Sequence, residues 1–312
     1  MRHLPALIAA ALLTTSPALA APKVIASVVP VQSIAAAVMG GTGTPELLLQ
    51  GSMSEHRAVF TPSQIAALGD ADLVFIVGQG LEAKLAQISG SDAVNGKRFI
   101  ELSDAPGIIR LPIRAGGAWE PDGGDHDHDH GDTHAAEGVL TFDPHIWLDP
   151  ENAKAMARAV ADALSRADPA NAAAYGANAG AFAAEIDRTS AAIAAELAPV
   201  KSKPFIVFHD AYQYFEKRFG LAGVGSISDV SAQAPSARRL AEVRDKIASA
   251  HAICVFREPQ FDGKAVQTVI EGTGAREGVL DPLGANLIPG PEAYPQLLRN
   301  LAKALKDCLS GS

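Results

Sequence analysis

The amino-acid sequence predicts an α/β protein with two lobes, each built on a parallel sheet, that are joined by a long rigid α-helix. The first indication is that short apolar runs of strand length alternate with helical segments in both halves of the chain. The second is length, because 312 residues reach the size at which one core stops growing and two domains become the default. The third is an alanine-rich segment between the halves, 168–198, which has the features of a single helix.

The predicted N-terminal lobe, 21–167, contains apolar runs typical of buried parallel strands. These runs are 24–28, 46–49, 73–77 and 98–102. Predicted helices lie between them at 32–39, which ends at Gly40 and Gly41, and at 61–68. Each run is continuous rather than alternating, so we expect helices to cover both faces of the sheet.

The segment 168–198 is the predicted linker helix. Asp168 stands at the capping position, Pro169 at the first helical position and Pro199 just beyond the end. A continuous helix here would be about 40 Å long at 1.5 Å per residue. We therefore expect a stiff spine between the lobes and not a flexible hinge.

The predicted C-terminal lobe, 199–312, repeats the alternation of strands and helices. Its candidate strands are 205–208, 224–227, 253–256 and 278–280. Its predicted helices include 237–249 and 293–309. The pattern again favours a parallel sheet.

Residues 1–20 are predicted to be a signal peptide. A short basic start precedes the apolar run 4–13, and the small residues Ala18 and Ala20 match a signal-peptidase site. We therefore expect cleavage after Ala20 and export of the mature protein to the periplasm.

The only two cysteines, Cys254 and Cys308, lie far from this cleavage site, so neither is placed to carry a lipid anchor. We expect a freely soluble periplasmic protein. In an oxidising compartment, two cysteines with none left over favour one disulfide, whereas a bare pair in the cytosol would more often be two unrelated buried thiols.

The charge balance argues against nucleic acid as a partner. The chain carries 26 lysines and arginines against 35 aspartates and glutamates, which gives a formal net charge of −9. An acidic chain without a basic stripe repels a phosphate backbone, so we expect no nucleic-acid binding.

A segment rich in histidine, 114–138, interrupts the predicted N-terminal lobe. It is poor in apolar residues, so we expect a disordered loop. Alternating histidines and carboxylates on a flexible chain suit weak binding of Zn²⁺, Cu²⁺ or Ni²⁺. The candidate auxiliary ligands are His126, His128, His130 and His134.

Four further polar residues each follow or end a strand-like run. They are His56 after 46–49, His145 after 139–142, His209 after 205–208, and Asp281 after 279–280. Ligands collect at the carboxyl ends of parallel strands, so these side chains can converge on one crevice between the lobes. Three imidazoles and a carboxylate make a competent tetrahedral zinc site.

A histidine ligand usually donates its second ring nitrogen to a carboxylate, which fixes the orientation of the ring. Three acidic residues lie near the candidate ligands in the sequence. They are Asp149, Asp210 and Glu258. We expect one or more of them to orient a ligand.

Five stretches of the sequence resemble the periplasmic zinc-binding proteins of ABC-type zinc importers, the ZnuA group, within a wider family that includes manganese-binding and adhesin-named lipoproteins. The stretches are Ser54-Glu55-His56, Asp143-Pro144-His145-Ile146-Trp147-Leu148-Asp149-Pro150, Phe208-His209-Asp210-Ala211-Tyr212-Gln213-Tyr214-Phe215, Glu258-Pro259-Gln260-Phe261 and Leu280-Asp281-Pro282-Leu283-Gly284. They cover almost the whole predicted mature chain in the expected order.

The resemblance implies that His56, His145, His209 and Asp281 bind the metal, with Glu55 as an alternate or supporting ligand. It also implies two Rossmann-like lobes joined by a long helix, a histidine-rich loop near the entrance, and a bridge between Cys254 and Cys308.

As a function, the resemblance implies capture of Zn²⁺ as a transported ligand and its delivery to an ABC-type permease in the inner membrane. We expect a monomer that is not an enzyme, with a periplasmic zinc chaperone as a further candidate partner.

Three other functions are weighed against zinc capture. A relative of the same family could capture manganese or iron. A zinc hydrolase would need an open coordination position and a general base, for which Glu55 is the candidate. An adhesin or a passive metal buffer would work without a permease.

Overall fold

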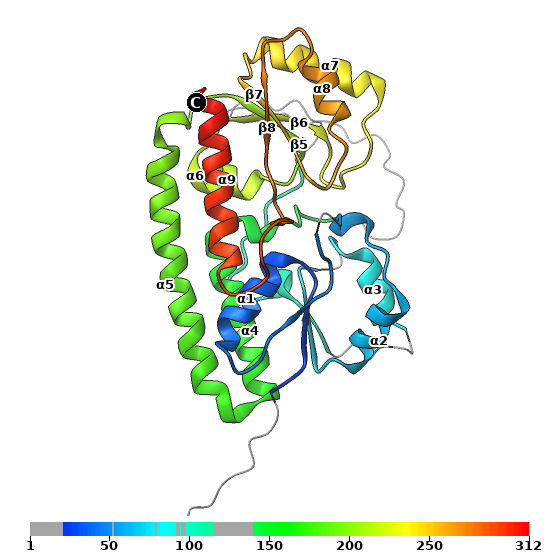
Figure 1. Ribbon diagram of the computed structural model, residues 1–312, viewed down its shortest axis with the longest axis vertical. Coiled ribbons are helices and arrows are strands. Elements are labelled where there is room, and N and C mark those ends of the chain that lie inside the picture. Colours follow the sequence, from blue (N-terminus) through cyan, green and yellow to red (C-terminus); the bar gives the residue numbers. More distant parts are fainter. Residues whose placement is uncertain are drawn as a thin grey trace, which may run out of the picture.

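The computed structural model describes residues 21–51, 53–78, 80–91, 94, 98–114 and 140–311. These residues form two α/β lobes beside a long helix, as the sequence predicts (Figure 1). The predicted signal peptide and the four loop histidines lie outside the described residues. Within the described part of the chain, no helix has the length and apolar character required to cross a membrane.

Each lobe contains a four-stranded parallel sheet, and the two sheets have the same strand order. In the N-terminal lobe the order is β2 (Glu46–Leu47), β1 (Val24–Ala26), β3 (Leu73–Ile76) and β4 (Phe99–Glu101). In the C-terminal lobe it is β6 (Gly223–Ser228), β5 (Phe205–His209), β7 (Cys254–Arg257) and β8 (Arg276–Val279). The strands predicted from both sets of apolar runs are therefore confirmed.

The helices of the N-terminal lobe are α1 (Val29–Met39), α2 (Pro62–Asp70), α3 (Ala83–Ser89) and α4 (Pro150–Ala167). Helix α2 begins at a capping box, because the Thr61 side chain accepts from the Gln64 amide while the Gln64 side chain accepts from the Thr61 amide. Helix α4 is absent from the predicted elements. Asp149 caps it by accepting from the amide of Glu151 at 2.9 Å.

The helices of the C-terminal lobe are α6 (Gln213–Phe219), α7 (Ala237–Ser249), α8 (Lys264–Ile270) and α9 (Ala293–Ser310). Helices α7 and α9 match their predicted ranges closely. Helix α9 returns to the other lobe and packs against α1, where Ser33 Oγ accepts from the Tyr294 amide at 2.8 Å.

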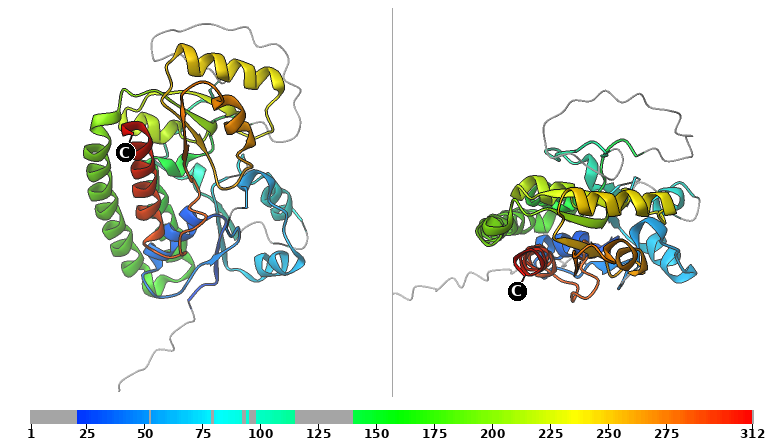
Figure 2. Two further views of the ribbon diagram at one scale, coloured as in Figure 1. Left: turned by 45° about the horizontal axis from the view of Figure 1, so that its top comes forward. Right: turned by 90° about the horizontal axis from the view of Figure 1, so that it is seen from above.

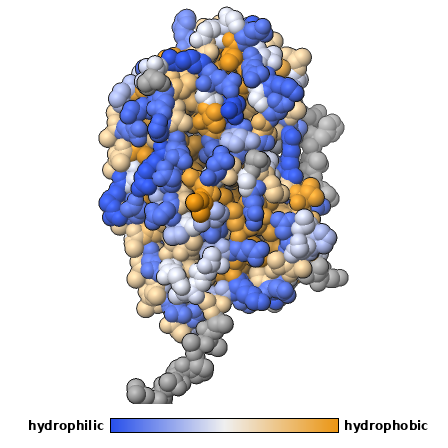
Figure 3. All heavy atoms as spheres, viewed as in Figure 1, coloured by the Kyte–Doolittle hydropathy of each residue, from blue (hydrophilic) through white to orange (hydrophobic). Residues whose placement is uncertain are grey.

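The linker is α5 (Ala172–Leu197), a helix of 26 residues, or about 39 Å at 1.5 Å per residue. A short 3₁₀ turn, Pro169–Asn171, precedes it. Asp168 is the N-cap residue of this turn and Pro169 follows it, as predicted. The Asp168 carboxylate accepts from Asn171 Nδ2 at 2.7 Å and from the Tyr175 hydroxyl at 2.8 Å. Figure 2 shows α5 and α9 end-on beside each other, and in Figure 3 hydrophilic residues gather over the upper part of the side on which these helices lie.

Alternation along the strands separates one central core from two outer ones. Phe75 of β3 and Val207 of β5 point into a central cluster that both lobes share with α1, α4, α5 and α9. Val74 and Ile206, their neighbours in sequence, point outward, the first to a cluster with α2 and α3 and the second to one with α7 and α8. The shared core makes the lobes one packed body and fixes the strand ends that face each other.

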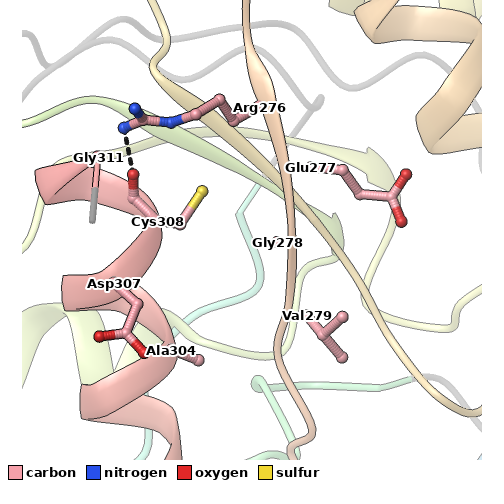
Figure 4. A pocket seen from close by; sticks show the side chains of 8 residues that line it. All are labelled: Arg276, Glu277, Gly278, Val279, Ala304, Asp307, Cys308 and Gly311. Atoms are coloured by element: carbon pink, nitrogen blue, oxygen red, sulfur yellow. Dashed lines mark hydrogen bonds between the residues drawn. The ribbon is translucent and has the colours of Figure 1, made fainter.

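The predicted disulfide is present and joins β7 to α9. Cys254 and Cys308 have Cα atoms 6.3 Å apart and close a sequence separation of 54 residues. A shallow surface hollow lies beside Cys308, between the edge strand β8 and α9, where Arg276 donates to the carbonyl of Cys308 (Figure 4). This hollow is lined by none of the predicted metal ligands.

Candidate metal centre

Three of the predicted ligands meet at one point between the lobes, together with Glu55. One ligand atom from each of Glu55, His56, His145 and His209 lies within 4.8 Å of the others. Two of these residues come from one turn of the N-terminal lobe, one from the segment before α4, and one from the C-terminal lobe.

His209 is the last residue of β5, as predicted, and its ring is fully buried. Glu258, just after β7, fixes the orientation of this ring. Its Oε1 accepts from His209 Nδ1 at 2.7 Å and from the His209 amide at 3.3 Å. The other ring nitrogen, Nε2, therefore faces the cluster. Glu258 therefore orients the His209 ring, as the sequence predicts.

His145 occupies a different position from the one predicted. The described residues 140–142 form no strand, and His145 instead precedes a 3₁₀ turn, Ile146–Leu148. Asp143 fixes it by accepting from the His145 amide at 3.0 Å and from Nδ1 at 2.8 Å. Asp143 was not among the predicted orienting residues, although a carboxylate two positions before a histidine is placed to reach both groups.

Glu55 and His56 lie on a 3₁₀ turn, Glu55–Arg57, well beyond the end of β2. Both offer buried polar atoms to the cluster. Glu55 Oε1 and His56 Nε2 are buried without a hydrogen-bond partner among the described residues. Such atoms are costly to bury unless something binds them.

The distances in the cluster suit a tetrahedral zinc ion. Bonds of about 2.0–2.2 Å at tetrahedral angles separate ligand atoms by about 3.3–3.6 Å. The Nε2 atoms of His145 and His209 are 3.2 Å apart. Glu55 Oε1 lies 3.7 Å from His56 Nε2 and 4.0 Å from His145 Nε2. Small adjustments of the Glu55–His56 turn would bring all four atoms to bonding distance.

Asp281 is outside this cluster, although it follows β8 as predicted. Its carboxylate accepts from Gln260 Nε2 at 2.9 Å. It also accepts from the backbone amides of Leu283, Gly284 and Ala285 at 3.2, 2.9 and 2.7 Å. These bonds hold the loop after β8. The carboxylate within the cluster is that of Glu55, the predicted alternate or supporting ligand.

The other two predicted orienting residues contact arginines instead of ligands. Asp149 pairs with Arg218 through two hydrogen bonds of 2.8 Å. Asp210 pairs with Arg114, which also donates to Glu216 at 2.6 Å. Arg114 was predicted to begin the disordered loop, but it is a described residue that packs into this acidic pair. The predicted start of the loop is therefore wrong at Arg114.

The electrostatics of the cluster divide the ligands into neutral and charged groups. Burial lowers the pKa of His56 and of His145 well below the ordinary value, and the neighbouring histidines lower it further. Burial raises the pKa of Glu55 to about 7. Burial also opposes charge on His209, but the carboxylates of Glu258, Glu55 and Asp210 together outweigh it and raise that pKa to about 9. The Nε2 atoms of His209 and His145 face each other at 3.2 Å, so only one of the two can carry a hydrogen.

Comparison with known proteins places this chain in a family. Residues 24–308 match the family model for ZnuA, described as the periplasmic component A of a zinc-uptake complex. The high-affinity zinc uptake system protein ZnuA of Brucella suis biovar 1 (strain 1330) is 46% identical and covers 92% of this chain and 91% of its own.

Two solved structures share the fold. A crystal structure of ZnuA has a TM-score of 0.76 at 28% identity and covers 93% of this chain and 99% of its own. A crystal structure of a ZnuA deletion mutant with zinc bound has a TM-score of 0.73 at 27% identity and covers 93% of this chain and 98% of its own.

Proposed function

This chain belongs to the ZnuA family of periplasmic zinc-uptake components, and on that premise we propose that it captures Zn²⁺ in the periplasm for delivery to an ABC-type permease. Zinc is the transported ligand and not a resident cofactor. The observation that carries the proposal is the buried convergence of three imidazoles and one carboxylate on a single point.

The ligand set of this proposal is His56, His145, His209 and Glu55. Two orphaned atoms, Glu55 Oε1 and His56 Nε2, support it, because a cation satisfies both at once. Asp281 is the alternative fourth ligand, and it would have to give up hydrogen bonds to three backbone amides in order to reach the metal.

The donor set favours zinc over manganese or iron. Three nitrogens and one oxygen in a closed four-coordinate shell suit Zn²⁺, whereas Mn²⁺ prefers oxygen donors and higher coordination. The test is competition among Zn²⁺, Mn²⁺ and Cu²⁺ for the refolded metal-free protein, followed by metal analysis. Preferential retention of Mn²⁺ would contradict the proposal.

A role in transport fits the site better than catalysis. Four protein donors close the coordination shell, whereas a hydrolytic zinc keeps a position for water. In this ligand set Glu55 binds the metal and is not available as a general base. A screen for ester and peptide hydrolysis at one zinc per protein should show no turnover above the metal-free protein.

The partners and the histidine-rich segment extend this proposal. A reconstituted permease of the same importer should take up zinc only when this protein is supplied, which distinguishes transport from an adhesin or a passive buffer. We propose that the protein acts as a monomer and that a periplasmic zinc chaperone is a further partner.

Deleting 126–134, which lies outside the described residues, should leave one tight zinc site and remove weaker ones. An unchanged stoichiometry in calorimetry would contradict that division.

A further inference from the structure

The residue that follows His56 makes a contact across the two lobes. Arg57 Nη2 donates to the backbone carbonyl of Ala232 at 2.7 Å. Arg57 belongs to the 3₁₀ turn that carries Glu55 and His56, and Ala232 belongs to the loop between β6 and α7. In Figure 1 the blue turn near residue 55 lies beneath this yellow-green loop of the other lobe.

Hydrogen bonds within the loop between β6 and α7 fix the orientation of the Ala232 carbonyl. Ala232 has a φ of +54°, a left-handed conformation that is unfavourable for any residue with a Cβ, and it is 1% exposed. Its amide donates to the Asp229 carbonyl at 3.1 Å, and the Ser231 amide donates to Asp229 Oδ1 at 3.0 Å. Ser228 Oγ donates to the Gln233 carbonyl. The direction of the Ala232 carbonyl is therefore set independently of Arg57.

The turn itself has little else to hold the His56 ring. Carboxylates at hydrogen-bond distance fix the rings of His145 and His209, whereas the closest carboxylate oxygen to His56 Nε2 among the described residues is Glu55 Oε1 at 3.7 Å. The backbone bond from the Arg57 amide to the Ser54 carbonyl, 3.2 Å long, closes the turn without tying it to the opposite lobe.

We propose that Arg57 is a positioning residue that latches the Glu55–His56 turn to the opposite lobe through Ala232 and thereby slows the release of the bound zinc ion. The inference rests on the proposed function. Breaking the latch would let the turn move away with two of the four ligands, so the effect falls on the dissociation rate more than on the association rate.

Electrostatic repulsion alone predicts that removing Arg57 would have the opposite effect on zinc binding. A guanidinium next to the ligands repels a divalent cation, so removing it should tighten zinc binding by simple electrostatics. The latch predicts faster release from the same substitution. The sign of the change therefore distinguishes the two explanations.

The experiment measures zinc dissociation from the full chain by stopped flow against an excess of a chelator. Arg57→Ala should accelerate dissociation about five- to tenfold, the amount expected for losing one ordinary hydrogen bond, because the exposed guanidinium is solvated and its charge adds little. Arg57→Lys keeps the charge and a hydrogen-bond donor, so its zinc dissociation rate should lie between those of Arg57→Ala and the wild type. Arg238→Ala removes an exposed arginine of α7 and should leave the rate unchanged.

Hydrogen exchange on the metal-free protein provides a readout that does not depend on zinc. Arg57→Ala should speed hydrogen exchange of the backbone amide at position 57 and of its neighbours in the turn. Exchange of the amides in α7 should not change. Unchanged or slower zinc release, or unchanged exchange in the turn, would overturn the latch. Failure of the wild type to bind zinc would refute the proposed function instead, and the exchange data would still decide on the latch.

Discussion

His145 and His209 are held differently from His56, although all three face the same point. The first two rings are fully buried, and each is anchored through Nδ1 to a carboxylate, Asp143 in one case and Glu258 in the other. His56 lies on a short turn with a side chain that is 7% exposed, and Arg57 supplies the contact to the opposite lobe.

The difference indicates a division of labour within the site. A preformed pair of ligands gives affinity because little ordering remains to be done when the metal arrives. In the proposed ligand set the turn carries the other two ligands, and movement of the turn would let the metal enter and leave without separating the lobes, whose shared core packs them as one body. We infer that capture and release depend on the turn and that affinity depends mainly on the fixed pair.

The largest effect should come from removing a fixed ligand. His209→Ala should weaken zinc binding by more than about a hundredfold, because loss of a ligand costs more than the loss of an outer partner. His209→Glu should also weaken zinc binding and narrow the preference for Zn²⁺ over Mn²⁺, since it replaces a nitrogen donor with an oxygen donor. Competition titrations on protein lacking 126–134 measure both. Wild-type discrimination in His209→Glu would show that the third imidazole does not set metal choice.

Zinc affinity should keep rising with pH up to about pH 9, because two of the proposed ligands have raised pKa values. The pKa of His209 is raised to about 9 and that of Glu55 to about 7. Zinc must displace a proton from His209 below pH 9 and a second from Glu55 below pH 7, so affinity rises with pH. The expected slope is about tenfold per pH unit between 7 and 9, steepening below 7. An affinity that is flat over this range would contradict the assignment of charge to His209.

The anchoring carboxylates should matter nearly as much as ligands. Asp143→Asn and Glu258→Gln keep the size of the side chain but weaken its hold on the ring nitrogen of His145 or His209. Each should lower zinc affinity about 10- to 100-fold. Isothermal titration with a competing chelator measures this, and Asp149→Asn, which affects the α4 cap and the pair with Arg218, is the matched control. Equal losses in the control would mean that the effect comes from the fold.

The sequence predicts the fold well because its strands and helices follow local patterns. Most of the continuous apolar runs become strands, eight of them within the described residues, and Thr61 begins α2 through a capping box that can be predicted from the residues themselves. Helix α4 was missed although Asp149 and Pro150 form a typical start and its apolar residues gather on one face.

The site could be predicted only in part. The three histidines were found because each stands out near a strand-like run, although only His209 ends a strand in the structure. The choice between Glu55 and Asp281 depends on where each carboxylate makes its hydrogen bonds, and spacing along the chain carries no information on that. The anchoring by Asp143 and the bridge from Arg57 to Ala232 depend in the same way on backbone conformation.

The smallest effect on zinc affinity should come from Asp281, and comparing it with Glu55 tests the turn as the carrier of the fourth ligand. Glu55→Gln should weaken zinc binding about tenfold, because an amide oxygen is a poorer donor than a carboxylate. Asp281→Asn should change it by less than about threefold while lowering the free energy of unfolding of the metal-free protein by about 1–2 kcal/mol, since its bonds to backbone amides weaken. Chelator competition and urea unfolding measure the two quantities separately. The reverse pattern, with affinity lost in Asp281→Asn and kept in Glu55→Gln, would move the fourth ligand to the loop after β8 and leave the turn with His56 alone.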